Sequence, residues 1–284
     1  MPKAMTSEQV ALQRQIIADL AVASTFDAAH EAERRVRFLA DYLHGSGLRT
    51  MVLGISGGVD SLAAGLLAQR AAVWLRENRN YDARFVAMRL PYGRQHDEDD
   101  ARACVDVIGP DQLIVTDVQQ ASDAMLDDLR RGGLSFDSPA RQDFVLGNIK
   151  ARQRMIAQFA VAGAASGLVI GTDHAAEALV GFFTKFGDGA ADVMPLAGLN
   201  KRRVRALAAH LGAPDALVFK VPTADLESLA PLRPDEEAFG VSYDDIDDFL
   251  EGKPISASAC DIILRHWRSS AHKRALPVVP PMLP

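Results

Sequence analysis

Cysteine is scarce in this sequence: Cys104 and Cys260 are the only two in 284 residues. Two thiols are too few for a disulfide framework or for a cysteine metal site. Their scarcity favours a reducing compartment, and we expect a cytoplasmic protein.

Long apolar runs are also missing. The first residues, MPKAMTSEQVALQRQ, lack the apolar core of a signal peptide. No apolar run approaches the roughly 20 residues that a helix needs to span a bilayer. The sequence therefore predicts a soluble protein with no membrane partner.

The chain has no excess of positive charge. It carries 31 Lys and Arg residues against 37 Asp and Glu residues, a formal net charge of −6. This balance argues against a broad nucleic-acid-binding surface, so no nucleic-acid partner is expected. The apolar share of 48% and the charged share of 24% are those of an ordinary globular protein.

The length of 284 residues allows one large α/β domain or two small ones. No internal repeat is present, and the segments Gly187–Asp192 and Ser228–Pro234 read as long loops rather than as linkers. We expect a single domain over residues 1–284. It begins with helices within residues 7–43 and ends in an irregular, proline-rich tail at 277–284.

Short apolar runs alternate with helical patterns along the chain. The strand-length runs are Met51–Ile55, Arg84–Leu90, Gln112–Val118 and Gly167–Thr172, with a weaker candidate at Ala216–Lys220. The helical patterns cover Ser7–Val22, Asp27–Leu43, Asp60–Arg76, Asp99–Ile108, Ala121–Arg131 and Asp143–Ala165. This alternation predicts an α/β fold, a Rossmann-like doubly wound parallel sheet of about five strands with helices on both faces.

The stretch LGISGGVDSLAAGLLAQ, Leu53–Gln69, reads as a strand that turns on glycines into a helix. A phosphate loop of the Walker type would place lysine at position 60, where this chain has Asp60. GISGG formally fits a nucleophile elbow with Ser56 at its centre. That fold needs several strands before the elbow, and the residues before Gly54 read as helices, so we set both interpretations aside.

A third interpretation treats Ser56, Gly57, Gly58 and Ser61 as a cradle for a pyrophosphate at a helix N-terminus. A carboxylate beside phosphates is tolerable when a divalent cation lies between them, and Mg²⁺ commonly binds one or two carboxylates plus substrate phosphates. Asp60 therefore suggests a metal–nucleotide complex. The alternative is an ordinary turn with an acid that favours the helix start.

SGGVDS resembles the pyrophosphate loop of the N-type ATP pyrophosphatases, which cleave ATP to AMP and pyrophosphate while activating a substrate oxygen. The resemblance implies an adenine nucleotide alpha-hydrolase-like fold. The loop is specific to the superfamily but does not choose a member within it.

The segment around GTDHAAEALVGFFTKFGDG adds a second group of chemical residues. Thr172 ends an expected strand and can cap the next helix, and Glu177 presents a carboxylate at the edge where open α/β sheets bind ligands. Glu177 could instead be a solvated helix acid, and His174 reads as a cap or packing residue more than as a ligand. Phe182 and Phe183 can sandwich a flat ring while Lys185 meets an anion, or they can belong to the core.

Asn200 is expected to cap a helix whose first turn holds Lys201, Arg202 and Arg203. Cations at this end oppose the helix dipole, which suggests an anion in front of them, such as a triphosphate. The alternative for Arg202 and Arg203 is a solvated basic surface.

Together with RLPYG, GNIKARQRM, PTADLE, SYDDIDDFLEG and AHKR, these motifs closely resemble the ammonia-dependent NAD⁺ synthetases, from the first helix to about Arg274. The resemblance implies a homodimeric ligase that uses ATP and Mg²⁺ to amidate deamido-NAD⁺ with ammonia. In this reaction ATP would activate the nicotinate carboxylate as an acyl adenylate, which ammonia then attacks. This route needs no covalent enzyme intermediate, so Ser56 and Ser61 are expected to bind phosphate rather than to act as nucleophiles. Cys104 and Cys260 show no glutaminase motif, which favours free ammonia or ammonia from a separate protein.

The resemblance also implies roles for individual residues. Asp60, Lys201 and Asp173 are the expected catalytic residues, with Asp173 as a candidate base for ammonium, and Asp60 and Glu177 are the expected Mg²⁺ ligands. The expected ATP contacts are Gly54, Ile55, Ser56, Gly57, Gly58, Val59, Asp60, Ser61, Arg89, Thr172, Lys201 and Thr223. The expected deamido-NAD⁺ contacts are Arg152, Lys185, Asp192, His272, Lys273 and the stacking aromatic Phe182.

Two departures and two rivals remain open. After PTADLE the chain runs SLAPLRPDE, which puts a second Mg²⁺ contact from Glu227 in doubt, and the tail ALPVVPPMLP lacks the aromatic and charged ending expected of the family. The rivals are another N-type ATP pyrophosphatase that amidates or thiolates a different acceptor, and a sensor that binds ATP without catalysis.

Overall fold

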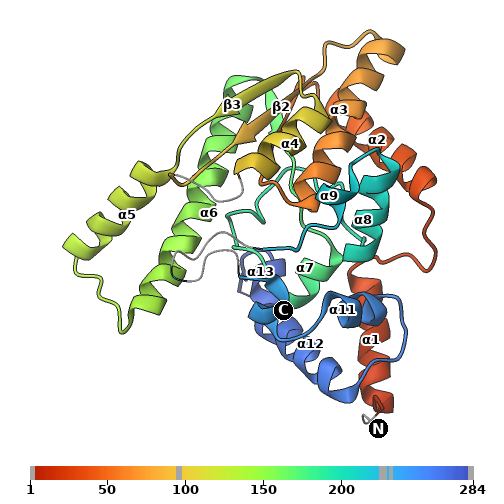
Figure 1. Cartoon of the computed structure of the whole chain (residues 1–284), viewed down its shortest axis with the longest axis vertical. Helices are drawn as coiled ribbons and strands as arrows, with labels where there is room; N and C mark the ends of the chain where they lie inside the picture. The colour runs from red at the N-terminus through yellow and green to blue at the C-terminus, as the bar shows by residue number, and fades with distance from the viewer. Residues whose placement is uncertain (1–3, 94–97, 224–228, 230–232, 281–284) are drawn as a thin grey trace.

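The computed structural model describes residues 4–93, 98–223, 229 and 233–280. Figure 1 shows a sheet with its covering helices above a smaller group of helices that holds both chain ends. The helices are α1 (Ser7–Asp19), α2 (Ala28–Gly45), α3 (Val59–Arg79), α4 (Glu98–Ile108), α5 (Gln119–Arg131), α6 (Pro139–Ala164), α7 (Ala175–Val180), α8 (Lys201–His210), α9 (Asp215–Val218), α10 (Asp235–Phe239), α11 (Tyr243–Leu250), α12 (Ala257–Ser269) and α13 (Ala271–Arg274).

The sheet has four parallel strands in the order β3-β2-β1-β4. They are β1 (Thr50–Gly54), β2 (Arg84–Arg89), β3 (Gln112–Val115) and β4 (Gly167–Val169). The chain first builds the sheet outward from β1 to β3 and then returns to add β4 on the other side of β1. The switch point therefore lies between β1 and β4, and ligands of open α/β sheets bind at the carboxyl ends of strands at such a point.

Strand β1 is buried on both faces, which is why it reads as an unbroken apolar run. Met51 and Leu53 point into a core shared with α2, α3 and α8. Val52 points to the opposite face, where it packs with residues of β2 and α6. Because successive side chains of a strand alternate between faces, one short strand serves both cores and fixes its own carboxyl end.

A third core joins the beginning and the end of the chain. Ile16 of α1 packs with α7, α11 and α12, and the side-chain amide of Gln13 donates to the carbonyls of Phe249 and Lys253 at 2.9 and 3.0 Å. Figure 1 shows α1 beside α11 and α12 below the sheet. Within this group, α7 and α11 lie nearest the carboxyl edge of the sheet, where the site is found.

The expected alternation of strands and helices is confirmed, with one wrong element. Ala216–Lys220 was predicted as a strand, but residues Asp215–Val218 form the short helix α9. Pro214 is its N-cap and Asp215 is in its first turn, and Leu217 and Val218 are buried against the core. A run of apolar residues this short does not distinguish a buried helical turn from a strand.

Residues 276–280 form no helix or strand, while 281–284 lie outside the described residues. Glu227 also lies outside them. Among the described helices, none is both long and apolar enough to cross a bilayer.

Candidate active site

A cavity of about 430 Å³ opens at the carboxyl ends of β1 and β4. The loop after β1, Glu177 of α7, Lys201 of α8 and the segment Gly181–Thr184 all contribute to its walls. Thr172, Thr223 and Lys273 line it as well. This volume suits a nucleotide-sized ligand.

The glycine loop joins β1 to α3 and faces the cavity with all its predicted residues except Gly57. Gly57 has φ +89°, and a Cβ there would approach the backbone nitrogen of Ala101 to 3.0 Å. The Ser61 hydroxyl donates to the Gly58 carbonyl at 3.0 Å and accepts from the Ser56 N–H at 3.2 Å. The turn is therefore held by its own serines and by the absence of a side chain at Gly57.

No side chain in the described part of the chain caps α3, whose N-cap residue is Gly58. Among the described residues, the helices α5, α9, α10 and α13 also lack a side-chain cap, whereas a side-chain oxygen or nitrogen caps each of α1, α2, α6, α7, α8, α11 and α12. The first N–H groups of α3 face the cavity with the positive end of the helix dipole behind them. Such a helix end is an anion-binding site.

Asp60 lies in the first turn of α3 and forms an ion pair with Lys201, whose Nζ is 2.7 Å from Oδ2. Burial raises the pKa of Asp60, but attraction from Lys201 and His174 outweighs it and holds that pKa well below its usual range. Burial lowers the pKa of Lys201, but Asp60 and Glu177 raise it further than burial lowers it. Both groups are therefore charged at neutral pH.

Asp60, His174 and Glu177 form a cluster whose facing atoms all lie within 4.8 Å of one another. Nε2 of His174 is 3.3 Å from Oδ1 of Asp60 and 3.7 Å from Oε2 of Glu177. Burial raises the pKa of Glu177 to about 8. Repulsion from Asp60 and Asp173 adds to this rise, and the attraction of His174 and Lys201 opposes it. Oδ1 of Asp60 is buried and accepts no hydrogen bond from the described residues.

This donor set fits a divalent cation held by oxygen. Two carboxylates that repel one another, one with an unsatisfied buried oxygen, gain from a cation between them. His174 accepts the backbone N–H of Glu177 with Nδ1 at 3.4 Å, which leaves a proton on Nε2, the nitrogen that faces Asp60. Asp60 and Glu177 are therefore the residues that could hold such a cation through oxygen.

Thr172 and His174 were both candidates to cap α7, and the structure confirms His174. Thr172 lines the cavity, but the side chain that caps α7 is that of His174, two residues later. The chain stays extended after β4, with φ −127° and ψ 171° at His174, so the helix begins only at Ala175. The delay aims His174 at Asp60.

Asp173 is 8% exposed and belongs to a second pair of acids. Burial, together with repulsion from Asp188 and Asp60, raises the pKa of Asp173 to about 8. Asp188 lines the cavity, and its Oδ1 accepts the Thr184 N–H at 2.9 Å. Asp173 is absent from the described cavity lining, so any proton that it exchanges passes through the adjoining groups.

The far end of the cavity is aromatic. Phe182 and Phe183 both line it, and Phe182 packs edge-on against Phe239 with ring centroids 5.2 Å apart. Lys273 of α13 donates to the carbonyls of Gly181 and Phe183, at 2.8 Å each. Burial lowers the pKa of Lys273. A flat ring could lie against these phenylalanines while the lysine meets its charge.

The family model of NAD synthase matches residues 31–277 of the chain. The chain belongs to the NAD synthase family. It is 63% identical over 274 residues to an "NH(3)-dependent NAD(+) synthetase" of Burkholderia lata, covering 96% of this chain and 97% of the relative. A curated protein of Burkholderia pseudomallei with the same name is 62% identical over 270 residues, 95% of each chain.

Solved structures agree with these sequence matches. A crystal structure of NAD⁺ synthetase from Burkholderia pseudomallei superposes with a TM-score of 0.83 at 59% identity, covering 96% of this chain and 99% of that chain. The structure of an NMN synthetase from Francisella tularensis superposes with a TM-score of 0.79 at 33% identity, covering 91% and 100%.

Five of the predicted contact residues lie outside the described cavity lining: Arg89, Arg152, Lys185, Asp192 and His272. Arg89 is buried and pairs with Glu98 at 2.7 Å, and Asp192 accepts the Val169 N–H at 2.7 Å. Arg152 donates to the Lys185 carbonyl at 3.1 Å, and Lys185 donates to the His272 carbonyl. Arg152, Lys185 and His272 therefore form a chain of contacts from α6 to α13, which we call the rim.

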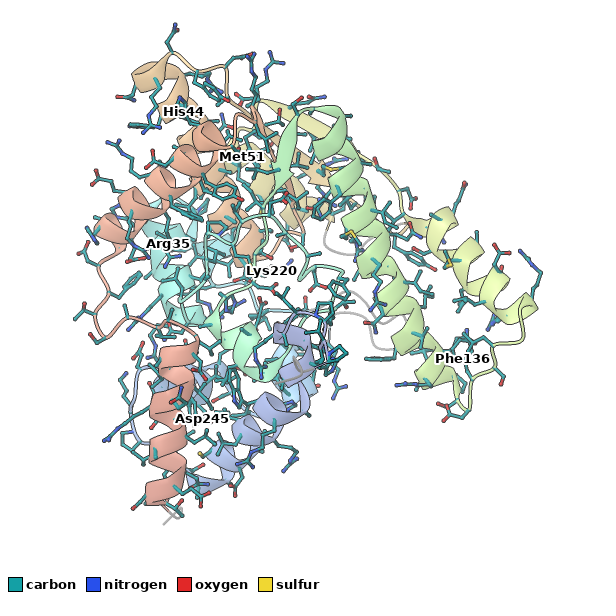
Figure 2. The ribbon with its side chains drawn as sticks, turned by 180° about the vertical axis from the view of Figure 1, so that it is seen from behind. Arg35, His44, Met51, Phe136, Lys220 and Asp245 are labelled. Carbon is teal, nitrogen blue, oxygen red and sulfur yellow. The ribbon has the colours of Figure 1, made fainter. Side chains whose placement is uncertain are left out.

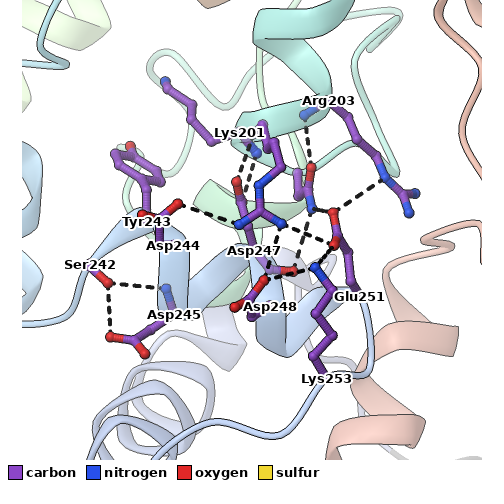
Figure 3. A network of polar contacts seen from close by, with 12 residues as sticks. Lys201, Arg203, Ser242, Tyr243, Asp244, Asp245, Asp247, Asp248, Glu251 and Lys253 are labelled. Carbon is purple, nitrogen blue, oxygen red and sulfur yellow. Dashed lines mark hydrogen bonds and ion pairs between the residues drawn. The ribbon is translucent and has the colours of Figure 1, made fainter.

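The anion expected in front of α8 is supplied by the protein itself. Both oxygens of Asp247 accept N–H groups of the first turn, from Lys201 at 2.9 Å and from Arg202 at 2.7 Å. Figure 3 shows this carboxylate beneath the end of α8. The interpretation of a triphosphate facing all three cations is therefore corrected. Only Lys201 lines the cavity, while Arg202 pairs with acids of α11.

Other cavity residues gave no clear signal in the sequence. Lys220 lines the cavity and pairs with Asp100 of α4 at 2.6 Å. Figure 2 shows Lys220 near the centre of the molecule, where the sheet meets the lower helices. Asp188, Arg233 and Asp235 also line the cavity. They come from loops and short helices, which carry no periodic pattern.

Proposed function

We propose that this protein amidates deamido-NAD⁺ with ammonia and consumes ATP, giving NAD⁺, AMP and pyrophosphate. One observation carries the proposal: the Asp60–Lys201 ion pair and Glu177 lie at the uncapped end of α3, where a triphosphate and its cation would bind. The high identity to the NH(3)-dependent NAD(+) synthetases supports the choice of acceptor and nitrogen donor.

The chemistry explains why ATP is needed. A carboxylate does not react with ammonia at neutral pH because its leaving group would be oxide. Attack of a nicotinate carboxylate oxygen on the α-phosphorus forms an acyl adenylate and releases pyrophosphate. Ammonia then attacks the carbonyl carbon, the bond to the adenylate oxygen breaks, and AMP leaves with a proton lost from nitrogen. No bond to the protein is formed.

The residues act by positioning and by electrostatics. The N–H groups of the glycine loop and the hydroxyls of Ser56, Thr172 and Thr223 would bind phosphate oxygens, and Lys201 would neutralise the charge on the departing pyrophosphate. Asp60 and Glu177 would hold Mg²⁺. When bound, Mg²⁺ would neutralise phosphate charge and polarise the phosphorus.

The acceptor would occupy the aromatic end of the cavity. Phe182 would stack on the nicotinate ring and Lys273 would meet its carboxylate or a phosphate. Arg152, Lys185, Asp192 and His272 would contact the remainder of the dinucleotide along the rim, and Arg89 would join the ATP site by exchanging its partner Glu98. Asp173 lies outside the described cavity lining, so it would take a proton from ammonium through an adjoining group, and a carboxyl pKa of about 8 suits that transfer at neutral pH.

A homodimer fits the exposed apolar surface of α5 and α6. Met125, Leu129, Phe144 and Ile156 on these helices are 39–53% exposed. The adjacent edge strand β3 exposes Leu113 and Val115 as well. Figure 1 shows α5 and the lower half of α6 extending away from the rest of the molecule. A second copy of the chain would cover this face and the open sheet edge.

Sedimentation of the purified protein tests the dimer. The wild type should sediment as a dimer and Ile156→Arg as a monomer, with Arg14→Ala on the far helix α1 as the control. A monomeric wild type contradicts the assembly.

A product assay tests the reaction. Protein, ATP, Mg²⁺ and ammonium are incubated with deamido-NAD⁺ or with nicotinate mononucleotide, and products are separated by chromatography. Equal amounts of NAD⁺ and AMP, lost without Mg²⁺, support the proposal. The mononucleotide is included because the fold matches an NMN synthetase, and its faster amidation would replace the acceptor. AMP without amide would point to another acceptor, and ATP binding without AMP would point to a sensor.

A further inference from the structure

Helix α11 reaches the site through Asp247, which lies beneath the N-terminus of α8. Asp247 is 2% exposed, and it accepts the backbone N–H groups of Lys201 and Arg202 across 46 and 45 residues of sequence. Both of its oxygens are used in this way. A carboxylate from a distant helix thus binds the residue whose side chain meets Asp60.

Capping alone does not account for this arrangement. A helix start leaves its first N–H groups without partners, and one side-chain cap normally serves it. Asn200 already provides that cap by accepting the N–H of Arg203 at 2.9 Å. Asp247 takes the two N–H groups that would otherwise face solvent or a ligand. Its contacts fix the position of α8 relative to α11.

The same face of α11 also contacts the other end of Lys201. Tyr243 lies four residues before Asp247, so both side chains project from one side of the helix. The ring of Tyr243 is 4% exposed, and its centroid is 5.1 Å from Nζ of Lys201. The Tyr243 hydroxyl donates to Asp235 at 3.1 Å, which fixes the ring. Lys201 is therefore held at its backbone by Asp247 and at its ammonium by Tyr243.

The charges in the first turn of α8 explain why its contact with Asp247 is needed. Lys201, Arg202 and Arg203 occupy the first turn of α8, where the helix dipole repels cations. Lys201 is 1% exposed, so water cannot take the place of a protein partner. Asp60 pairs with the ammonium of Lys201 and other acids pair with Arg202, but Asp247 is the carboxylate that accepts the backbone N–H groups of both residues.

We propose that Asp247 is a positioning residue for Lys201, and that through it α11 sets the distance between the lysine ammonium and the phosphate site. Asp247 touches no substrate in this scheme. The inference rests on the proposed function, in which Lys201 acts on the pyrophosphate. Loss of Asp247 therefore slows the adenylation step more than it weakens ATP binding.

A double-mutant cycle tests the proposal. Asp247→Ala and the milder Asp247→Asn are made in the wild type and in Lys201→Met. The matched control is Asp244→Ala, an acid on the same helix whose side chain is 90% exposed and pairs with Arg202. Steady-state kcat and KM for ATP are measured for each, with ATP affinity by calorimetry and unfolding midpoints by circular dichroism.

We expect Asp247→Ala to lower kcat about 10²-fold, the effect of a misplacement of about 1 Å, with KM for ATP changed less than about 3-fold. The kcat of Asp247→Asn should lie between those of Asp247→Ala and the wild type, and the kcat of Asp244→Ala should match the wild type. When Asp247→Ala is added to Lys201→Met, kcat should fall by less than about 2-fold, since the ammonium that Asp247 positions is already absent. An equal loss in both backgrounds, or none in either, overturns the proposal.

A second measurement tests the positioning role even if Asp247→Ala folds poorly. It also applies if the wild type makes no NAD⁺, a result that would refute the proposed function but not the positioning role. Amine acylation of Lys201 is followed by peptide mass spectrometry, with the exposed Lys253 as internal reference. The buried ion pair should protect Lys201 in the wild type, and the folded Asp247→Asn variant should label at least several-fold faster. Unchanged labelling in that variant refutes the positioning role whatever reaction the protein catalyses.

Discussion

Lys201 and Asp60 are 141 residues apart in the chain, yet Nζ of one lies 2.7 Å from Oδ2 of the other. The contact joins the first turns of α8 and α3, both of which begin at the carboxyl edge of the sheet. A buried ion pair is weak support for stability, because desolvation opposes the attraction. Its position at an uncapped helix end instead fits a role in binding and charge neutralisation.

Asp60→Asn should reduce turnover about 10²-fold or more while the protein still folds. Asparagine keeps the shape of the side chain and one oxygen for Lys201, but it removes the charge that would attract Mg²⁺. NAD⁺ formation measured against Mg²⁺ concentration checks this, with Asp248→Asn on α11 as the control. Unchanged Mg²⁺-dependent activity would remove Asp60 from the metal site.

Gly57→Ala should destabilise the unliganded protein by about 1–3 kcal/mol. Its φ of +89° and the 3.0 Å approach to the nitrogen of Ala101 leave no place for a Cβ. Gly58→Ala is the matched control, because Gly58 has φ −88° and its added Cβ would meet only the Ser56 hydroxyl at 3.5 Å. Urea unfolding of both variants compares them, and equal midpoints would show that the turn tolerates a side chain.

Asp173 should make the metal-free protein less stable as pH rises. The unfolded carboxyl loses its proton near pH 4, whereas the folded one keeps it to about pH 8. Between these values the folded state binds more protons, so the free energy of unfolding falls with increasing pH.

Asp173→Asn should therefore raise the unfolding midpoint at pH 8 by several degrees and leave it nearly unchanged at pH 4, since each kcal/mol moves Tm by about 2–4 °C in a chain of this size. The same substitution should lower activity if Asp173 takes the proton of ammonium. Thermal unfolding in the presence of a chelator measures the first effect, with the exposed Asp244→Asn for comparison. A gain that is equal at both pH values would contradict the raised pKa.

Phe182→Leu should raise KM for deamido-NAD⁺ about 10-fold and leave KM for ATP within about 2-fold. Leucine fills the position but cannot stack on a flat ring, and an aromatic contact is worth about 0.5–1.5 kcal/mol. Phe186→Leu is the control, because Phe186 is 57% exposed and lies outside the described cavity lining. A parallel rise in both KM values would mean that Phe182 supports the fold alone.

The sequence predicted the parts of the site that follow from local patterns. SGGVDS after an apolar run indicated a strand, a tight turn and a helix, and the structure has β1, the loop and α3 at these positions. Asn200 was predicted to cap α8, and its side chain accepts the N–H of Arg203. Both features depend on neighbouring residues and the backbone, which is why one sequence suffices to find them.

Pairings across the fold were beyond such patterns. Nothing near Arg202 in the chain indicates that its partners are Asp248 of α11 and Glu251, the C-cap residue of that helix. His174 gave the signal of a cap, and only the fold, which brings His174 to the first turn of α3, shows that its second nitrogen faces Asp60. The helix α9 was mistaken for a strand because burial, which decided its form, depends on the surrounding core.

The most direct test traces the nicotinate carboxylate oxygen, which the proposed mechanism transfers to AMP. Deamido-NAD⁺ labelled with ¹⁸O in the nicotinate carboxyl is converted with ATP, Mg²⁺ and ammonium, and the products are analysed by mass spectrometry. The account predicts one labelled oxygen in each AMP, because the carboxylate oxygen that attacks the α-phosphorus leaves with the adenylate. Unlabelled AMP, or label released as inorganic phosphate together with ADP, would contradict the acyl-adenylate mechanism.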